Sequence, residues 1–456
     1  MSTCKPVLLS ALPLSALLLA ALPASAAFST PPPDLDRQTL PLNDGWASQP
    51  TAALPQGTTG GSAADAARVH TVSDRNALVA ALAFPDPTPK IIRISGMIDA
   101  NVDDAGNPLT CADYARPDAQ TGTPYSLDAF LATYDPAVWG RVNPSGPLER
   151  ARVASAAAQQ ARVRIRVPAN TTIVGVGHGA GLRGGWVDIR PSSTSGNQPM
   201  NVIVRNLSFV DTYDCFPQWA PTDGAEGNWN SLYDAISVRN STHVWIDHNA
   251  FLDIDTADSG QPSYFGRLYQ VHDGLVDVTN ESDLVTVSWN LLANHDKAML
   301  FGSSDSAVAD RGKLRVTLHH NLFHDLGQRV PRVRYGQVHV YNNQYSLTSE
   351  GAQTYGYSWG AGIEGQIHAQ NNHFLMPVAV TPDLFVERFN GTALQARGTL
   401  LNGFTRFSEV DVVAAFNATS ATPLDPNVAW TPTLYRRIDP TWSVPLTVIL
   451  GAGPFK

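Results

Sequence analysis

Three arginines crowd one short stretch of the chain, and their spacing points to an anionic ligand. Residues 329–343 read RVPRVRYGQVHVYNN, so Arg329, Arg332 and Arg334 flank a single proline and an alternating strand follows at once. Clustered guanidinium groups repel one another and are costly to bury without partners. The pattern favours a rigid strand that holds an anion. The alternative is a solvated basic loop or salt bridges to local acids.

Three aspartates form a second candidate group. Asp273 and Asp277 are four residues apart, so on a strand both would project from one face, and Asp234 precedes them in the chain. Carboxylates that converge without a basic partner raise one another's pKa, and a hard cation relieves that repulsion. Ca²⁺ prefers carboxylate oxygens with water or substrate oxygens, although the spacing is not that of an EF-hand. The alternative is surface acids that point into water.

Other polar residues carry less information. Lys297, in the sequence HDK, lies on the approach to the same face, but an isolated lysine there would be ordinary surface. Several histidines could suggest zinc, yet they scatter over different sides of the repeat described next, so we expect structural or stacking roles. These are His248, His295, His319, His320 and His324. We find no nucleophile elbow or phosphate loop in the sequence.

A repeat in the second half of the chain indicates the fold. Each copy has apolar residues five and three positions before an asparagine and another two positions after it. The asparagines are Asn249, Asn290, Asn321, Asn343 and Asn372, and an earlier copy has Leu207 at this position. A period of two that is interrupted once per copy indicates short strands joined by a tight bend. Asn tolerates the left-handed backbone of such a bend, and stacked Asn side chains can bond from copy to copy.

Stacked copies predict an all-β protein. No single copy can bury its apolar face, so the copies must pack on one another. We predict a right-handed parallel β-helix with loops that form a cleft on one side. A β-sandwich is the structural alternative, but antiparallel hairpins would not place the same Asn in each copy.

The repeat also aligns the candidate groups. Counted back from the bend Asn of its copy, Asp234 lies 15 residues before it, Asp273 and Asp277 lie 17 and 13 before it, and Arg329 lies 14 before it. If coils stack about 4.8 Å apart, Asp234 is one coil from the other two acids, and Arg329 is two coils, roughly 10 Å, further on. We therefore expect all four on one wall of one groove.

Composition and the N-terminus limit the partners and the location. A formal net charge of −9 argues against nucleic acid, so an acidic ligand must be held by a local basic cleft. Lys5, the apolar run 7–22 and the sequence ASA at 24–26 have the order of a secretory signal, and the run is too short for a membrane span. We therefore expect a secreted monomer that does not bind membranes.

The predicted organisation has three parts. They are a signal peptide at 1–26, an extended N-terminal lead-in at 27–66, and a parallel β-helix domain at 67–456 whose C-terminal tail packs on it. Cys111 and Cys215 remain after removal of the signal. In an exported protein they either pair or stay as buried thiols.

Taken together, the motifs resemble those of the polysaccharide lyase family 1 pectate lyases, over residues 68 to about 402. The matching segments are NTTIVGVG at 170–177, VWIDH at 244–248, DGLVD at 273–277, HDK at 295–297 and RVPRVR at 329–334. The resemblance implies a parallel β-helix. It also implies calcium-dependent cleavage of (1→4)-α-D-galacturonan, the de-esterified pectin polymer, by β-elimination to 4,5-unsaturated oligogalacturonides.

The resemblance also implies a role for each candidate residue. Asp234, Asp273 and Asp277 match the calcium ligands, Arg329 the catalytic base, and Lys297 and Arg334 the groups that bind the uronate carboxylate, with Arg332 as a further substrate contact. Some relatives have a fourth acid two residues before the first ligand. This chain has Leu232 there, so its site would depend more on water and substrate oxygens.

Three other functions and one other base stay open at this point. A pectin lyase on the same fold would act on methyl esters without the metal, and a β-helix polygalacturonase would need paired carboxylates for hydrolysis. A non-enzymic polyuronate-binding protein would keep only the arginines. Lys297 is the alternative base, because lysine loses its proton more readily than arginine. A base that must be neutral predicts an alkaline optimum.

Overall fold

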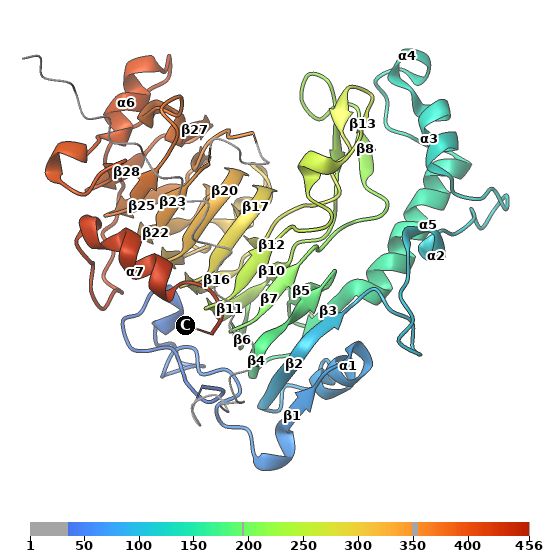
Figure 1. Ribbon diagram of the computed structural model, residues 1–456, viewed down its shortest axis with the longest axis horizontal. Coiled ribbons are helices and arrows are strands. Elements are labelled where there is room, and N and C mark those ends of the chain that lie inside the picture. The colour runs from blue at the N-terminus through green and yellow to red at the C-terminus, as the bar shows by residue number, and fades with distance from the viewer. Residues whose placement is uncertain (1–34, 194–195, 349–353, 456) are drawn as a thin grey trace, which may run out of the picture.

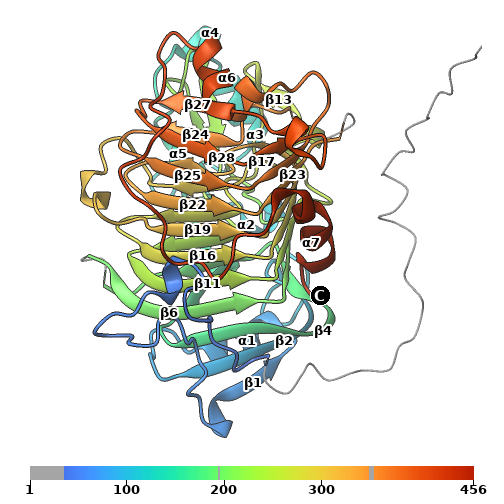
Figure 2. The ribbon, with the colours of Figure 1, turned by 90° about the vertical axis from the view of Figure 1, so that its left-hand side faces the viewer.

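The computed structural model describes residues 35–193, 196–348 and 354–455. The predicted signal peptide lies outside these residues. Within them, parallel strands stack coil upon coil along one axis, and the side view shows one strand of each coil above the next (Figures 1 and 2). The predicted parallel β-helix is confirmed.

One sheet carries the candidate site residues. It has eight strands in the order β27-β24-β21-β18-β15-β10-β5-β3, and neighbouring strands pair in parallel. Its strands are β3 (Arg164–Val167), β5 (Trp186–Ile189), β10 (Ile236–Arg239), β15 (Val276–Thr279), β18 (Leu300–Phe301), β21 (Arg332–Val333), β24 (Trp359–Gly362) and β27 (Val386–Phe389). Because each coil contributes one strand, residues in register form rows along the axis of the β-helix.

The other faces belong to a 17-stranded sheet in which two parallel runs meet at a bend. Strands β2 (Lys90–Asp99) and β4 (Thr171–Arg183) run through the bend. The strands before the bend are β1 (Val69–Val72), β6 (Gln198–Arg205), β11 (Ser241–Asp247), β16 (Asp283–Ser288), β19 (Val316–His319), β22 (Gln337–Tyr341), β25 (Gln366–Gln370) and β28 (Leu394–Arg397). Those after it are β7 (Ser208–Val210), β12 (Ala250–Leu252), β17 (Leu291–Lys297), β20 (Leu322–Gln328), β23 (Gln344–Ser346), β26 (His373–Leu375) and β29 (Leu400–Leu401).

The repeated asparagines form a buried ladder at this bend. The side-chain amide of each donates to the side-chain oxygen of the next: 3.0 Å from Asn249 to Asn290 and from Asn290 to Asn321, 2.9 Å to Asn343 and 3.1 Å to Asn372. The predicted copy-to-copy bonding is therefore confirmed. The prediction that the ladder Asn itself has a left-handed backbone was wrong by one position. The residue before each ladder Asn has this backbone. Those residues are His248, Trp289, His320, Asn342 and Asn371, with φ between 49° and 55°.

The interior of the coil is apolar along its whole length. Inward residues of all three faces form one buried cluster that runs from Val72 to Leu424. Aromatic rings stack from coil to coil inside it, with ring centroids 4.9 Å apart for Phe209 and Phe251 and 4.3 Å apart for Tyr345 and Phe374. Burial of this surface supplies the main stabilising free energy of the coil.

Helices and hairpins attach to the outside of the coil. The helices are α1 (Arg75–Leu82), α2 (Cys111–Tyr114), α3 (Leu127–Tyr134), α4 (Pro136–Trp139), α5 (Pro147–Val163), α6 (Val412–Thr419) and α7 (Val444–Gly451), and the hairpins pair β8 (Gln218–Ala220) with β9 (Asn228–Asn230) and β13 (Ser263–Tyr264) with β14 (Arg267–Leu268). Phe130 and Tyr134 of α3 pack with Trp219 and Trp229 of the first hairpin. Figure 1 shows this group rising beside the eight-stranded sheet.

A disulfide and hydrogen bonds to the sheet hold the outer segments. Cys111 and Cys215 form a disulfide with Cα atoms 5.3 Å apart, which answers the question left open by the sequence. The lead-in lies against the 17-stranded sheet, where the backbone amide of Ala47 donates to Thr286 Oγ1 over 3.0 Å. Among the described residues, no helix is both long and apolar enough to span a membrane.

Candidate active site

Two of the three predicted metal-binding acids converge on one point of the eight-stranded sheet. Asp277 lies on β15, in register with Ser237 of β10, and Asp234 lies two residues before β10 begins. A Cβ placed on Gly274 would lie 2.4 Å from Asp277 Oδ1 and 2.9 Å from Asp234 Oδ1. Any larger residue at this position would displace the two carboxylates, because they occupy the space beside it. Sequence spacing correctly placed these two acids on neighbouring coils.

The third acid is placed differently from the prediction. Strand β15 begins at Val276, so Asp273 lies in the segment before it and does not share a strand face with Asp277. Its Oδ1 lies 3.4 Å from Lys297 Nζ, and its side chain is 31% exposed, whereas Asp277 is 7% exposed. The extended backbone that the D-x-x-x-D argument assumed begins only at Val276, because the chain bends at Leu275. Among the described residues, no three His, Cys, Asp or Glu side chains form a closed metal cluster.

Electrostatics at this point favour a cation. Burial, and secondarily the nearby Asp273, raises the pKa of Asp234 to about 7. Burial, followed by Asp234 and Asp273, raises the pKa of Asp277 well above its usual range. Hydrogen bonds from Gly274 N to Asp234 (3.0 Å) and from Leu300 N to Asp277 (2.9 Å) hold the carboxylates in place. Two adjacent, fixed carboxylates with a third at their edge fit a hard divalent cation.

The basic residues lie on the next coils. Lys297 ends β17, is 6% exposed and pairs in register with Gln328 of β20, so Arg329 follows directly on the neighbouring coil. Arg329 has a left-handed backbone with φ of 60°, and its buried Nε has no hydrogen-bond partner among the described residues. Arg329 precedes β21, which is the second strand along from β15 in the eight-stranded sheet, so it lies two coils from Asp277. The structure thus brings together Lys297, Arg329 and the acids as predicted.

The other two arginines are held by different contacts. Arg334 donates from Nε to Asp305 Oδ1 over 2.6 Å and from Nη1 to Gly302 O over 2.9 Å, and it is 8% exposed. Arg332 lies with its guanidinium carbon 3.7 Å from the ring centroid of Phe389. Burial, followed by the positive charge of Arg334, lowers the pKa of Arg332 to about 10.

A buried histidine that the sequence assigned to general structural roles supports the site directly. His295 Nε2 lies 2.8 Å from the backbone oxygen of Asp273, and its Nδ1 lies 2.6 Å from Asp253 Oδ2. Burial alone would lower the pKa of His295, but the Asp253 carboxylate raises it to about 9. His295 therefore fixes the segment that carries Asp273. Its place two residues before Lys297 was the only signal in the sequence.

The other histidines follow the stacking prediction in part. The rings of His248 and His320 sandwich Trp289, with ring centroids 5.8 and 4.2 Å apart. This stack lies on the outside of the Asn bend, away from the eight-stranded sheet.

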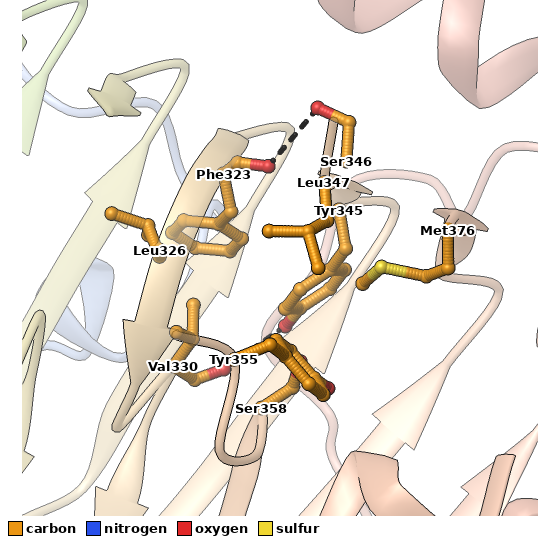
Figure 3. A pocket seen from close by; sticks show the side chains of 9 residues that line it. All are labelled: Phe323, Leu326, Val330, Tyr345, Ser346, Leu347, Tyr355, Ser358 and Met376. Carbon is orange, nitrogen blue, oxygen red and sulfur yellow. Dashed lines mark hydrogen bonds between the residues drawn. The ribbon is translucent and has the colours of Figure 1, made fainter. Parts of the chain in front are cut away.

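A small cavity near Arg329 is not a ligand site. It lies between β20 and β23, is lined by Phe323, Leu326, Val330, Tyr345 and their neighbours, and has about 10 Å³ of room for the centre of a water molecule (Figure 3). That volume is about the minimum for one water.

Comparison with known proteins agrees with this geometry. The family model described as pectate lyase matches residues 142–429. A pectate lyase of Bacillus subtilis (strain 168) is 46% identical over 444 residues, which cover 97% of this chain and 98% of that protein. The chain belongs to the pectate lyase family. It is a lyase that acts on polysaccharides.

Solved structures extend the likeness of this pectate lyase to three dimensions. A structure described as a pectate lyase bound to hexasaccharide is 46% identical, with a TM-score of 0.84 over 92% of this chain and 98% of that chain. The pectate lyase of Acidovorax avenae subsp citrulli is 35% identical, with a TM-score of 0.83 over 96% of this chain and 98% of that chain.

Proposed function

We propose that this pectate lyase is secreted, requires Ca²⁺ and cleaves polygalacturonate by β-elimination to 4,5-unsaturated oligogalacturonides. The observation that carries the proposal is the convergence of Asp234 and Asp277 on Gly274, next to a row of basic residues. The hexasaccharide in a 46% identical pectate lyase supports an oligosaccharide chain as ligand.

In this proposal the acids hold the cation and the basic residues hold the sugar. Asp234, Asp273 and Asp277 would bind Ca²⁺, which when bound supplies positive charge for the uronate carboxylate. Lys297 and Arg334 bind that carboxylate and stabilise the charge that develops next to it, and Arg332 is a further contact. His295 holds Asp273 in place through its backbone oxygen.

Arg329 removes the proton from C5 of the sugar. The electron pair of the C5–H bond forms the C4–C5 double bond, and the C4–O4 bond breaks. The leaving O4 takes a proton from solvent, and Arg329 later returns its proton to solvent, so no water is consumed.

A base must be neutral to act, and arginine is normally protonated. Burial and neighbouring positive charges both disfavour a protonated guanidinium, and in the same cluster burial first, then the charge of Arg334, lowers the pKa of Arg332. The proposal therefore includes an alkaline pH optimum.

Two further observations bear on the alternatives and the location. Asp277 Oδ1 and Asp234 Oδ1 lie 2.4 and 2.9 Å from one point, so the two oxygens are less than about 6 Å apart. Inverting hydrolases separate their two carboxyl groups by roughly 6.5–9.5 Å to leave room for a water. The Cys111–Cys215 disulfide supports an oxidising compartment, in line with the predicted signal peptide. Mass analysis of the exported protein would test cleavage after residue 26.

One assay tests the central proposal. The protein is mixed with polygalacturonate and either Ca²⁺ or a chelator, and the ultraviolet absorbance of the unsaturated product is followed. We expect absorbance to rise only with Ca²⁺. Reducing ends without absorbance would indicate a hydrolase, turnover of methyl-esterified pectin in chelator would indicate a pectin lyase, and binding without cleavage would indicate a non-enzymic protein.

A further inference from the structure

Four arginines surround one buried aspartate on the first coils of the eight-stranded sheet. Asp188 of β5 is 0% exposed, and it accepts hydrogen bonds from Arg164 Nε at 2.6 Å and Arg239 Nη2 at 2.9 Å. Arg190 Nε lies 3.2 Å from the same carboxylate. The fourth arginine is Arg166 of β3, which is in register with Asp188 of β5. The mechanism above uses none of these residues.

The positive charge of this cluster exceeds what Asp188 can neutralise. Burial, then Arg164 and Arg190, lowers the pKa of Arg166, and burial together with Arg164 and Arg239 lowers that of Arg190, with Asp188 opposing both. The Nε atoms of Arg166 and Arg190 are buried and have no hydrogen-bond partner among the described residues. Guanidinium groups that repel one another in this way gain most from an added anion.

The cluster is rigid yet reaches solvent. The side chains of Arg164, Arg190 and Arg239 are 18%, 28% and 27% exposed. Arg164 and Arg239 lie 5.2 and 4.8 Å from the ring centroid of Trp186. Guanidinium groups held by stacking lose less conformational entropy when they bind an anion than free surface side chains do. Because the whole chain has a formal net charge of −9, the positive charge of this cluster is confined to one part of the molecule.

The cluster also lies in line with the candidate active site. Parallel pairing puts Arg166, Asp188, Ser237 and Asp277 in one row across β3, β5, β10 and β15. Paired residues of parallel strands point to the same face, and three strand spacings amount to roughly 14 Å.

We propose that this arginine cluster is a distal subsite, which binds carboxylates of an anionic polysaccharide that extends from the reacting sugar toward the first coils. The inference rests on the proposed function, because it takes the polymer to be a polyuronate and places it along the rows of the sheet. The competing role is structural, in which the arginines only neutralise Asp188 and pack on Trp186.

The test compares a polymer with a short substrate. We expect Arg166→Gln/Arg190→Gln to raise KM for polygalacturonate about two- to tenfold, since exposed charge pairs contribute modestly, and to raise KM for trigalacturonate less. Its KM for the polymer should also depend less on salt, because fewer charge contacts are screened. Arg190→Gln alone keeps the stacking of Arg166 on Phe84, so it serves if the double variant does not fold.

Two controls separate charge from structure. Arg93→Gln removes a cation from the 17-stranded sheet, where Arg93 pairs with Asp36, and should leave KM for both substrates unchanged. Arg190→Lys keeps the charge and should keep KM for the polymer near that of the wild type. An unchanged polymer KM and salt dependence in the folded Gln variants would overturn the subsite while leaving the lyase proposal standing. A wild type that forms no unsaturated product would overturn the lyase proposal itself.

Discussion

Arg329 differs from an ordinary surface arginine in its side chain. Its left-handed φ of 60° is shared by the residues that precede the ladder asparagines, so this backbone belongs to the geometry of the coil. Its buried Nε has no partner among the described residues. Lys297, the rival base, lies beside Asp273 instead. We therefore propose Arg329 for proton removal and Lys297 for charge neutralisation.

Substitution of each residue tests this division. We expect Arg329→Lys to lower kcat on polygalacturonate at least about 100-fold, the usual contribution of general base catalysis, with a smaller change in KM. We expect Lys297→Ala to raise KM and retain measurable kcat. Both are measured by formation of unsaturated product. Substantial turnover by Arg329→Lys together with an inactive Lys297→Ala would assign the base to Lys297.

The converging acids predict opposite effects of one substitution with and without metal. In chelator, Asp277→Asn removes repulsion from Asp234, so its Tm should equal or exceed that of the wild type. Saturating Ca²⁺ should raise the Tm of the wild type, with about 2.7 kcal/mol of stabilisation at 100 times Kd, and leave that of the variant nearly unchanged. Thermal unfolding measures both.

Asp128→Asn is the matched control, because Asp128 is exposed on α3 and far from the acids in the chain. It should respond to Ca²⁺ as the wild type does. An undiminished response in Asp277→Asn would remove Asp277 from the cation site.

At the scale of elements, the sequence predicted the repeat well and its details less well. The spacing of the Asn residues predicted the bend and the ladder, because both depend on residues a few positions apart. The spacing did not show which residue of the bend is left-handed. The ladder Asn points its side chain inward to bond to the next Asn, and the residue before it, such as His248 or Trp289, takes the left-handed backbone. The bend at Leu275 leaves Asp273 outside β15, and beside it Gly274 N donates to the carboxylate of Asp234, which is distant in sequence.

Segments outside the coil were predictable only in part. Helix α1 starts after Asp74, a typical N-cap residue, whose side chain accepts a hydrogen bond from Ala77 N. The helices between residues 111 and 163 have weaker patterns, because they are held by aromatic packing with hairpins about 90 residues later in the chain. The arginine cluster escaped the sequence analysis for a related reason: Arg166, Asp188 and Arg239 become neighbours only through strand register.

The lead-in that packs on the 17-stranded sheet carries a pH-sensitive carboxyl group. Burial raises the pKa of Asp44 to about 6, with Arg436 opposing and Asp247 adding to the effect. The folded state therefore holds a proton between about pH 4 and pH 6 that the unfolded state has lost. The free energy of unfolding falls as pH rises through this window, and the loss is complete above it.

Asp44→Asn should remove this loss. Relative to the wild type, we expect the variant to gain stability as pH rises from 4 to 8, by up to about 3 kcal/mol for a shift of this size. Chemical unfolding at several pH values measures the difference. A gain that does not vary with pH would show that Asp44 is not the group responsible, and Asp128→Asn, on the exposed face of α3, should show no gain.

For the whole molecule, the disulfide joins an outer helix to the side of the candidate site. Cys111 begins α2, and Cys215 lies 104 residues later, next to Asp214. Asp214 accepts a hydrogen bond from Leu232 N at 3.2 Å, two residues before Asp234. The disulfide thus closes a loop of the chain that contains α3, α4, α5 and the first coils.

Loss of this cross-link should affect stability more than catalysis. We expect Cys111→Ser/Cys215→Ser to lose about 2–5 kcal/mol, because closing a long loop restricts the unfolded chain. Its activity at 25 °C should stay within about twofold of the wild type, since the hydrogen bonds of Asp214 remain. Thermal unfolding with and without a reducing agent measures the effect. With the reducing agent, the Tm of the wild type should approach that of the variant. The Tm of the variant should not change when the reducing agent is added. Equal Tm values for the oxidised wild type and the variant would mean that the cross-link does not stabilise the fold.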